Sequence, residues 1–253
     1  MKLSLSHGKK AYFASDQHFG ALDVVSSRRR EQQFVRWLEQ IKADAQILFL
    51  LGDVFDFWFE YREVVPKGFV RTLGKLAEMN DHGIRIIFFV GNHDLWLKEY
   101  LPEEIGAMIF YEKTDCLIDE KLFLIGHGDG LGPVDVRYKR LKRLFTNRWA
   151  CFLFRWLHPD LGVRFGRYLS LKNKANRGYV NSPFLGEDKE RLILYAKRKL
   201  KEKAYDFFIF GHRHLPSDIA LSPQSRYINL GDWMQHFTYA EYDGRDIQLK
   251  KSR

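Results

Sequence analysis

The amino-acid sequence predicts a layered α/β fold in which two β-sheets are flanked by helices. Short apolar runs alternate with segments of helical periodicity, which is typical of α/β layers. Further strand-like segments after residue 217 indicate a second sheet that packs against the first. With 253 residues, 45% of them hydrophobic, the chain can bury one substantial core. We therefore predict a single domain over residues 1–253 that carries one insertion.

The predicted elements follow one another in strand–helix alternation. In the first half they fall at residues 11–14 (strand), 27–43 (helix), 46–51 (strand), 67–81 (helix) and 84–90 (strand). The first helix places Phe34, Trp37, Leu38 and Ile41 on one face, as a helix packed on a sheet requires. Later strands are expected at residues 122–125 and 207–210, and in the tail at 227–230, 237–242 and 247–249.

Polar strings follow five of these strands. They are Asp16-Gln17-His18, Gly52-Asp53-Val54-Phe55-Asp56, Gly91-Asn92-His93-Asp94, Gly126-His127-Gly128-Asp129 and Gly211-His212-Arg213-His214. The strands of such folds end at one edge, so we expect these side chains to converge there. Five of the nine histidines lie in the strings, a concentration that turn residues merely capping strands would not require. Oxygen and imidazole ligands without thiolate suit manganese, iron or zinc.

The chain between Asp135 and Gly178 differs from the rest in charge. It holds twelve Lys and Arg residues against two acidic ones, while the whole chain carries a formal net charge of +9. Large apolar residues recur three or four apart within it, which predicts an amphipathic helix with a basic opposite face. These are Leu141, Leu144, Phe145, Trp149, Phe152, Leu153, Trp156 and Leu157. We predict a helical, basic and aromatic lid over residues 131–185.

Two interpretations of this insertion remain open. Its apolar stripe could pack on the core while its charges are solvated. The aromatic density and one-sided charge favour a lid that meets an amphiphilic anionic partner, either a membrane surface or a lipid phosphate. We expect no nucleic-acid partner, because proteins that bind the phosphate backbone seldom need so continuous an apolar stripe.

Cysteine content and the chain start indicate the compartment. Cys116 and Cys151 form no disulfide framework and match no zinc spacing, which favours a reducing environment. The first ten residues are polar and basic, and no stretch has the roughly 18 apolar residues of a spanning helix. We expect a cytoplasmic protein that is peripheral on the cytoplasmic face of the inner membrane.

The five strings resemble the motifs of the calcineurin-like metallophosphoesterase superfamily. Within it, the run Gly52–Trp58, the run His127–Leu131 and the basic insertion after it are similar to the branch that cleaves UDP-2,3-diacylglucosamine in lipid A synthesis. The resemblance implies a sandwich of two mixed β-sheets flanked by helices. It also implies hydrolysis of the substrate's pyrophosphate to UMP and 2,3-diacylglucosamine 1-phosphate. The chain departs from proteobacterial members, which have Arg in place of His93 and Cys in place of Gly132.

The resemblance further implies two divalent metal ions, with manganese favoured. One ion would be held by Asp16, His18 and His214, the other by Asn92, His127 and His212, and Asp53 would bridge them. Two such cations can activate water and hold phosphate oxygens for in-line attack. Asp56 and Asp129 are expected to orient a histidine or a loop amide instead of binding metal.

His93 is the candidate for proton donation to the phosphate or leaving group, with Asp94 expected to fix its tautomer. The alternative is a histidine that only packs beside the ligands. By resemblance, Asp135, Tyr138, Ser170, Lys172 and Lys174 are candidate substrate contacts, and the lysines could equally be solvated helix charges. Two other functions remain open: a phosphodiesterase acting on nucleotides or nucleic acid, and a metal-binding scaffold without turnover.

Overall fold

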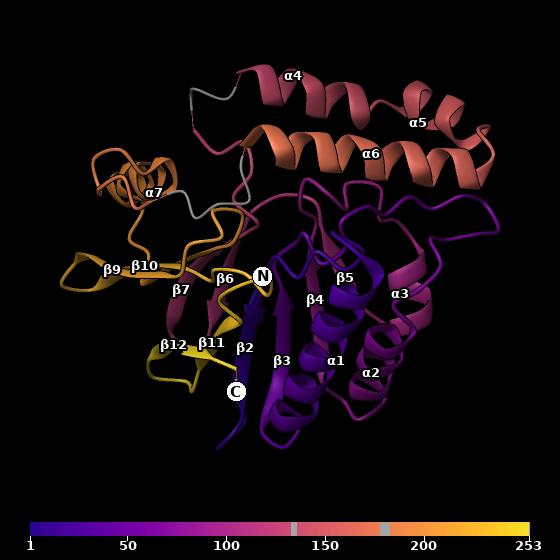
Figure 1. Ribbon diagram of the computed structural model, residues 1–253. Coiled ribbons are helices and arrows are strands. Elements are labelled where there is room, and N and C mark those ends of the chain that lie inside the picture. Colours follow the sequence, from indigo (N-terminus) through magenta and orange to yellow (C-terminus); the bar gives the residue numbers. More distant parts are fainter. Residues whose placement is uncertain (133–135, 178–182, 253) are drawn as a thin grey trace.

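The computed structural model describes residues 1–132, 136–177 and 183–252, excepting the side chains of residues 136, 137 and 171–177. In these residues two six-stranded mixed sheets stack face to face, with helices on both outer faces (Figure 1). Asp135 lies outside the described residues, as do the side chains of Lys172 and Lys174. Figure 1 shows further helices across the top of the sandwich.

The first sheet carries the early strands of the chain. Its order is β12 (Ile247–Lys251), β11 (Thr238–Tyr242), β2 (Lys10–Ala14), β3 (Ala45–Leu50), β4 (Arg85–Phe89) and β5 (Met108–Phe110). Strands β2 to β5 are parallel, and β11 pairs antiparallel with both β2 and β12. The parallel strands therefore end at the same edge.

The second sheet takes its strands from the middle and end of the chain. Its order is β1 (Lys2–Leu3), β6 (Thr114–Ile118), β7 (Lys121–Ile125), β8 (Phe207–Phe210), β10 (Ser225–Asn229) and β9 (Ser217–Ser222). Strands β7, β8 and β10 are parallel to one another. Strand β6 is antiparallel to β7 and parallel to β1, and β9 is antiparallel to β10. The predicted tail strands thus divide between the sheets: β10 joins the second sheet, and β11 and β12 extend the first.

Successive side chains along each strand point to opposite faces of the sheet. Each sheet therefore packs against the other sheet on one face and against helices on the other, which gives a four-layer sandwich. In β2 and β3, Phe13 and Phe49 face the second sheet and stack with ring centroids 4.6 Å apart. Tyr12 and Leu48 point the other way, into the core beneath the helices α1 (Val24–Ile41), α2 (Val70–Asp81) and α3 (Tyr100–Ile105). Helix α7 (Arg191–Glu202), which the sequence analysis did not predict, covers the outer face of the second sheet.

Helices α1 and α2 begin at other residues than predicted, because local backbone and capping interactions set their first residues. Helix α1 begins three residues earlier than expected because the Asp23 carboxylate accepts hydrogen bonds from the amides of Val25 and Ser26. Helix α2 begins three residues later than expected, after Gly68 and Phe69, which both have positive φ angles. The short strands β1, β5, β6 and β9 and the helix α3 were also not predicted.

The described part of the insertion forms three helices instead of one. They are α4 (Val136–Phe145), α5 (Arg148–Arg155) and α6 (Pro159–Arg177). Asn147 begins α5 by accepting hydrogen bonds from the amides of Trp149 and Ala150, and α6 begins at Pro159. In Figure 1 the three helices lie above the loops that follow the parallel strands. Within the described part of the chain, every helix is too short or too polar to cross a bilayer.

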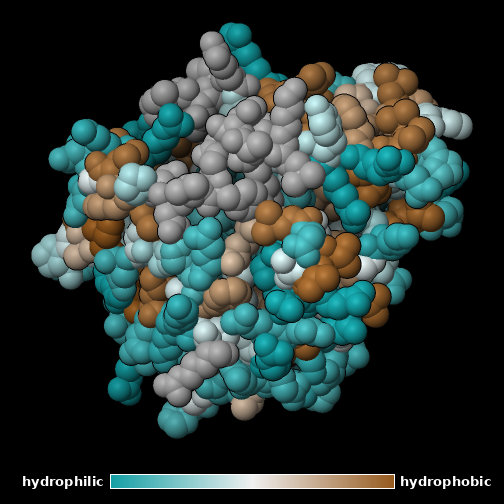
Figure 2. Space-filling view, viewed as in Figure 1, coloured by the Kyte–Doolittle hydropathy of each residue, from teal (hydrophilic) through white to brown (hydrophobic). Residues whose placement is uncertain are grey.

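Apolar side chains of the insertion remain at the surface. Trp149 and Trp156 are 76% and 77% exposed, and α5 has no buried residue. Phe154 connects α5 with the core, with its ring centroid 4.6 Å from that of Phe59. Figure 2 shows hydrophobic groups gathered at the upper right, over this part of the insertion. The stripe is therefore only partly covered by the core.

Candidate metal centre

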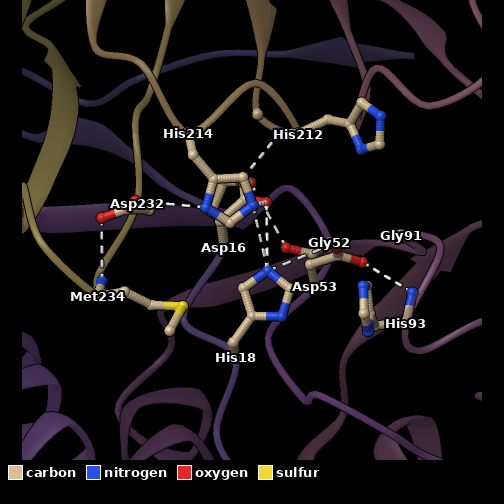
Figure 3. Close-up of polar contacts among 12 residues, drawn as sticks. Asp16, His18, Gly52, Asp53, Gly91, His93, His212, His214, Asp232 and Met234 are labelled. Atoms are coloured by element: carbon tan, nitrogen blue, oxygen red, sulfur yellow. Dashed lines mark hydrogen bonds and ion pairs between the residues drawn. The ribbon is translucent and has the colours of Figure 1, made fainter. Parts of the chain in front are cut away.

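The five polar strings follow β2, β3 and β4 of the first sheet and β7 and β8 of the second. The structure brings their side chains together at the edge where these strands end (Figure 3). Convergence from two sheets explains how residues almost 200 positions apart in sequence come into contact: the amide of His212 donates to Asp16 Oδ2 over 2.9 Å.

The loops carrying these residues have unusual backbone geometry. Asp16, His18, Asp53, His212 and His214 all have positive φ angles, between 46° and 64°. For residues other than glycine this left-handed conformation is uncommon and costs free energy. Five such residues at one place indicate that the surrounding fold holds the loops in a geometry required for function.

The first group consists of Asp16, His18 and His214, whose potential ligand atoms lie within 4.8 Å of one another. His214 Nε2 is 3.2 Å from Asp16 Oδ1 and 3.3 Å from His18 Nε2. Asp16 Oδ1 is fully buried, yet it accepts no hydrogen bond from the described residues. A buried carboxylate oxygen without a donor is costly, and a cation held by this group would satisfy it.

The second group consists of Asp53, His127 and His212. His127 Nε2 is 3.2 Å from His212 Nδ1 and 3.3 Å from Asn92 Oδ1, so the amide of Asn92 joins the same cluster. Imidazole, carboxylate and amide groups that converge in this way fit a divalent cation of the first transition row.

Asp53 connects the two groups. Its Oδ2 lies 3.6 Å from His18 Nε2 and 3.3 Å from His127 Nε2, and its Oδ1 accepts a hydrogen bond from the His93 amide. Gly91 makes room for this carboxylate, because a Cβ at Gly91 would lie 2.3 Å from Asp53 Oδ1. The carboxylate is therefore placed where it could contact cations in both groups.

Acceptor oxygens near Nδ1 orient three of the imidazoles. His127 Nδ1 lies 2.7 Å from the Leu51 carbonyl oxygen, and His214 Nδ1 lies 3.3 Å from Asp232 Oδ2. His18 Nδ1 lies 3.3 Å from Asp56 Oδ1. An acceptor at Nδ1 fixes the proton there and leaves Nε2 as the ligand atom that faces the cluster.

The electrostatics of the cluster favour cations. Burial raises the pKa of Asp53, but the charges of His127 and His93 outweigh it and hold this pKa well below its usual range. Burial lowers the pKa of His127, yet the Asp53 carboxylate raises it overall to about 10. Burial and the neighbouring His127 lower the pKa of His212 to about 4. The anionic carboxylates thus draw positive charge into a buried site, as a metal centre requires.

The contacts of His93 differ from those expected. Its Nδ1 lies 3.0 Å from the Asp56 carbonyl oxygen and 3.7 Å from Asp56 Oδ1. The Asp94 carboxylate instead accepts hydrogen bonds from the amides of Gly91 and Val54, and burial beside Asp53 raises its pKa to about 7. Asp56 therefore makes the contact to the His93 imidazole that was expected of Asp94. His18, Asp56 and His93 also form a third group of potential ligands.

Two of the candidate substrate residues contact acidic residues of the polar strings. The Tyr138 hydroxyl donates to Asp129 Oδ2 over 2.5 Å, and Lys142 Nζ lies 2.7 Å from the same oxygen. The Ser170 hydroxyl donates to Asp56 Oδ2 over 2.8 Å. Asp56 and Asp129 thus both link the loops of the cluster to the insertion.

Asp232 is a site residue that the sequence analysis missed. It follows β10, and its Oδ1 accepts hydrogen bonds from the amides of Met234, Gln235 and His236 while its Oδ2 faces His214 (Figure 3). The signal was available, because Gly231-Asp232 follows a predicted strand in the same way as Gly52-Asp53. It was overlooked because no histidine accompanies it.

Comparison with known proteins identifies relatives of this chain. The profile of the calcineurin-like phosphoesterase family matches residues 10–216. The chain is 39% identical to UDP-2,3-diacylglucosamine hydrolase of Porphyromonas gingivalis, over 95% of this chain and 97% of that protein. Proteins of the same name from Tolumonas auensis and Actinobacillus succinogenes are 28% and 26% identical, over 86% and 96% of this chain and 88% and 99% of theirs.

Proposed function

Because the chain belongs to the calcineurin-like phosphoesterase family, we propose that it hydrolyses the pyrophosphate of UDP-2,3-diacylglucosamine to UMP and 2,3-diacylglucosamine 1-phosphate. The choice of substrate rests on the 39% identity to a hydrolase named for that substrate, over nearly the full length of both chains. The adjoining groups of potential ligands support the reaction type. The product would enter lipid A synthesis.

Asp16, His18 and His214 would hold one divalent ion and Asn92, His127 and His212 the other, with Asp53 between them. When bound, a pair of Mn²⁺ ions supplies Lewis-acid chemistry and lowers the pKa of water. The chain contributes a rigid geometry: strained loops and acceptors at Nδ1 hold the ligand atoms in place before any ion binds.

His93 would donate a proton or a hydrogen bond to the charge that develops on the phosphate or the leaving group. The Asp56 carbonyl, 3.0 Å from Nδ1, fixes the proton on that nitrogen. Nε2 would then serve the substrate, and it donates from the imidazolium form, in which both ring nitrogens carry a proton. Water would attack the phosphorus that stays with uridine.

The insertion would shelter the acyl chains and contact the membrane. Its exposed aromatic residues and its excess of Lys and Arg suit an anionic lipid surface on the cytoplasmic side. Tyr138, Ser170, Lys172, Lys174 and Asp135 remain candidate contacts to the sugar phosphate.

The direct test is a substrate panel with Mn²⁺, with and without chelator. We expect UMP from UDP-2,3-diacylglucosamine and no turnover after chelation. Turnover of a cyclic nucleotide or a phosphoprotein, without turnover of the lipid, would contradict the assigned substrate. Failure to hydrolyse even an aryl phosphodiester with Mn²⁺ present would indicate a scaffold.

Replacing Asp232 with asparagine should weaken Mn²⁺ binding about 10-fold or more, because His214 loses the carboxylate that orients it. Isothermal titration of metal-free protein measures the change. Asp243→Asn is the matched control, since Asp243 also accepts backbone hydrogen bonds in a turn, from the amides of Arg245 and Asp246. Equal Mn²⁺ affinity of the two variants would exclude the orienting contact.

Replacing Trp149 and Trp156 together with serine should reduce flotation with anionic liposomes about 10-fold or more, because both exposed indoles would insert at the interface. Leu194→Ser on α7, which removes an exposed apolar residue outside the insertion, should leave flotation unchanged. Flotation by the tryptophan variant at the wild-type level would remove the insertion as the membrane contact.

A further inference from the structure

One face of α6 lies unusually close to the chain that follows β3. Gly162, Gly166 and Ser170 are spaced four residues apart, so they share a helix face. A Cβ at Gly166 would lie 2.1 Å from Phe57 Cε2, and a Cβ at Gly162 would lie 2.0 Å from the Tyr61 hydroxyl oxygen. The backbone of α6 therefore packs directly on these rings, at a distance that only glycine permits.

This close packing brings Ser170 into the candidate metal centre. Ser170 is 6% exposed, and its hydroxyl donates to Asp56 Oδ2 over 2.8 Å. The same oxygen of Ser170 lies 3.3 Å from His93 Nδ1. The insertion thus lies over the cluster and also contacts it directly through the Ser170 hydroxyl.

Asp56 connects Ser170 to two of the cluster's histidines. Its Oδ2 accepts from Ser170, while its Oδ1 lies 3.3 Å from His18 Nδ1. Its carbonyl oxygen lies 3.0 Å from His93 Nδ1. One residue therefore contacts the helix of the insertion, a candidate ligand and the candidate proton donor.

We propose that Ser170 is a positioning residue: held in place by the packing of Gly166 on Phe57, it fixes Asp56, whose carboxylate orients His18 and whose carbonyl oxygen orients His93. The inference rests on the metal centre proposed above. The insertion would then have a second role besides substrate contact, because metal binding and turnover would depend on the packing of α6 against Phe57.

The experiment compares Ser170→Ala and Gly166→Ala with Gly74→Ala. Ser170→Ala removes the hydroxyl alone, and Gly166→Ala pushes α6 away from Phe57. Gly74 also lies within a helix, α2, but a Cβ there meets no atom within 4 Å, so it controls for the glycine-to-alanine change itself. Thermal unfolding of each variant checks that the fold is retained.

Two measurements separate positioning from substrate contact. The first is Mn²⁺ affinity of the metal-free full-length protein by isothermal titration. The second is kcat for bis(p-nitrophenyl) phosphate, which has neither acyl chain nor uridine. We expect Ser170→Ala to weaken Mn²⁺ binding and lower kcat each about 5- to 10-fold, through loss of one hydrogen bond to a charged group behind a ligand. Gly166→Ala should lower both at least as much, and Gly74→Ala should match the wild type.

Wild-type values of both quantities in Ser170→Ala would overturn the inference and leave Ser170 as a substrate contact at most. A wild-type protein that binds no Mn²⁺ would instead overturn the proposed function, and the inference with it. The two failures are therefore distinguishable.

Discussion

Replacing Asp53 with asparagine should reduce turnover of UDP-2,3-diacylglucosamine by about 1000-fold or more, the largest single effect expected in this protein. Asp53 Oδ2 lies between His18 Nε2 and His127 Nε2, at 3.6 and 3.3 Å, and no other described carboxylate approaches both groups in this way. An amide has nearly the same shape but no charge, so the site would lose both its central anion and its affinity for the cations. Steady-state UMP release and the Mn²⁺ content of purified protein measure the two losses.

Asp119→Asn provides a matched control for this change. Asp119 has a φ angle of 53°, the same as Asp53, and its carboxylate accepts a hydrogen bond from the Leu5 amide far from the cluster. We expect this variant to keep wild-type activity. Substantial turnover by Asp53→Asn at saturating Mn²⁺ would show that the carboxylate is not needed between the two groups.

Replacing His93 with alanine should lower kcat about 100-fold or more while two Mn²⁺ ions remain bound. The reason is that His93 lies beside the ligand groups and takes its own orientation from Asp56, so its removal deletes a proton donor and leaves the ligands intact. Turnover with an aryl phosphodiester and metal analysis of the same sample separate rate from metal content.

His82→Ala is the control for His93→Ala, because His82 is exposed and contacts the carbonyl oxygen of Glu78 at the end of α2. It should behave as wild type. If His93→Ala lost metal in proportion to rate, His93 would act on the ligands and not on the substrate. An unchanged kcat would mean that it only packs beside them.

The sequence predicted that the polar strings converge, because the relevant pattern is local. Each apolar strand and the polar string after it are continuous in sequence, and parallel strands must end at a common edge. Asp16, Asp53 and His127 could therefore be placed together without a structure. The family profile and the sheets confirm the α/β fold class on which this reasoning depended.

Contacts between residues far apart in sequence could not be predicted in this way. Asp94 was expected to orient His93 because it is the next residue, but adjacent side chains at a turn point in different directions, and Asp56 occupies that place from another loop. Likewise, strand order was not readable from the tail: β11 pairs with β2, and β10 with β8. Pairing depends on packing of the whole sheet, which apolar periodicity does not encode.

The insertion shows the limit of periodicity in another way. Its apolar spacing predicted one amphipathic helix, but Asn147 and Pro159 divide it, because an N-capping side chain and a proline each favour a new helix start. The close seating of Gly166 on Phe57 could not be foreseen, since a glycine in a helix gives no sign of what approaches it.

Hydrolysis of UDP-2,3-diacylglucosamine in ¹⁸O-labelled water, with Mn²⁺ and with chelator, tests the central claim most directly. Mass spectrometry of both products shows which phosphorus receives the water oxygen. The account predicts one ¹⁸O atom in UMP, none in 2,3-diacylglucosamine 1-phosphate, and neither product after chelation. Label in the lipid product, or UMP formed at an undiminished rate without divalent metal, would contradict it.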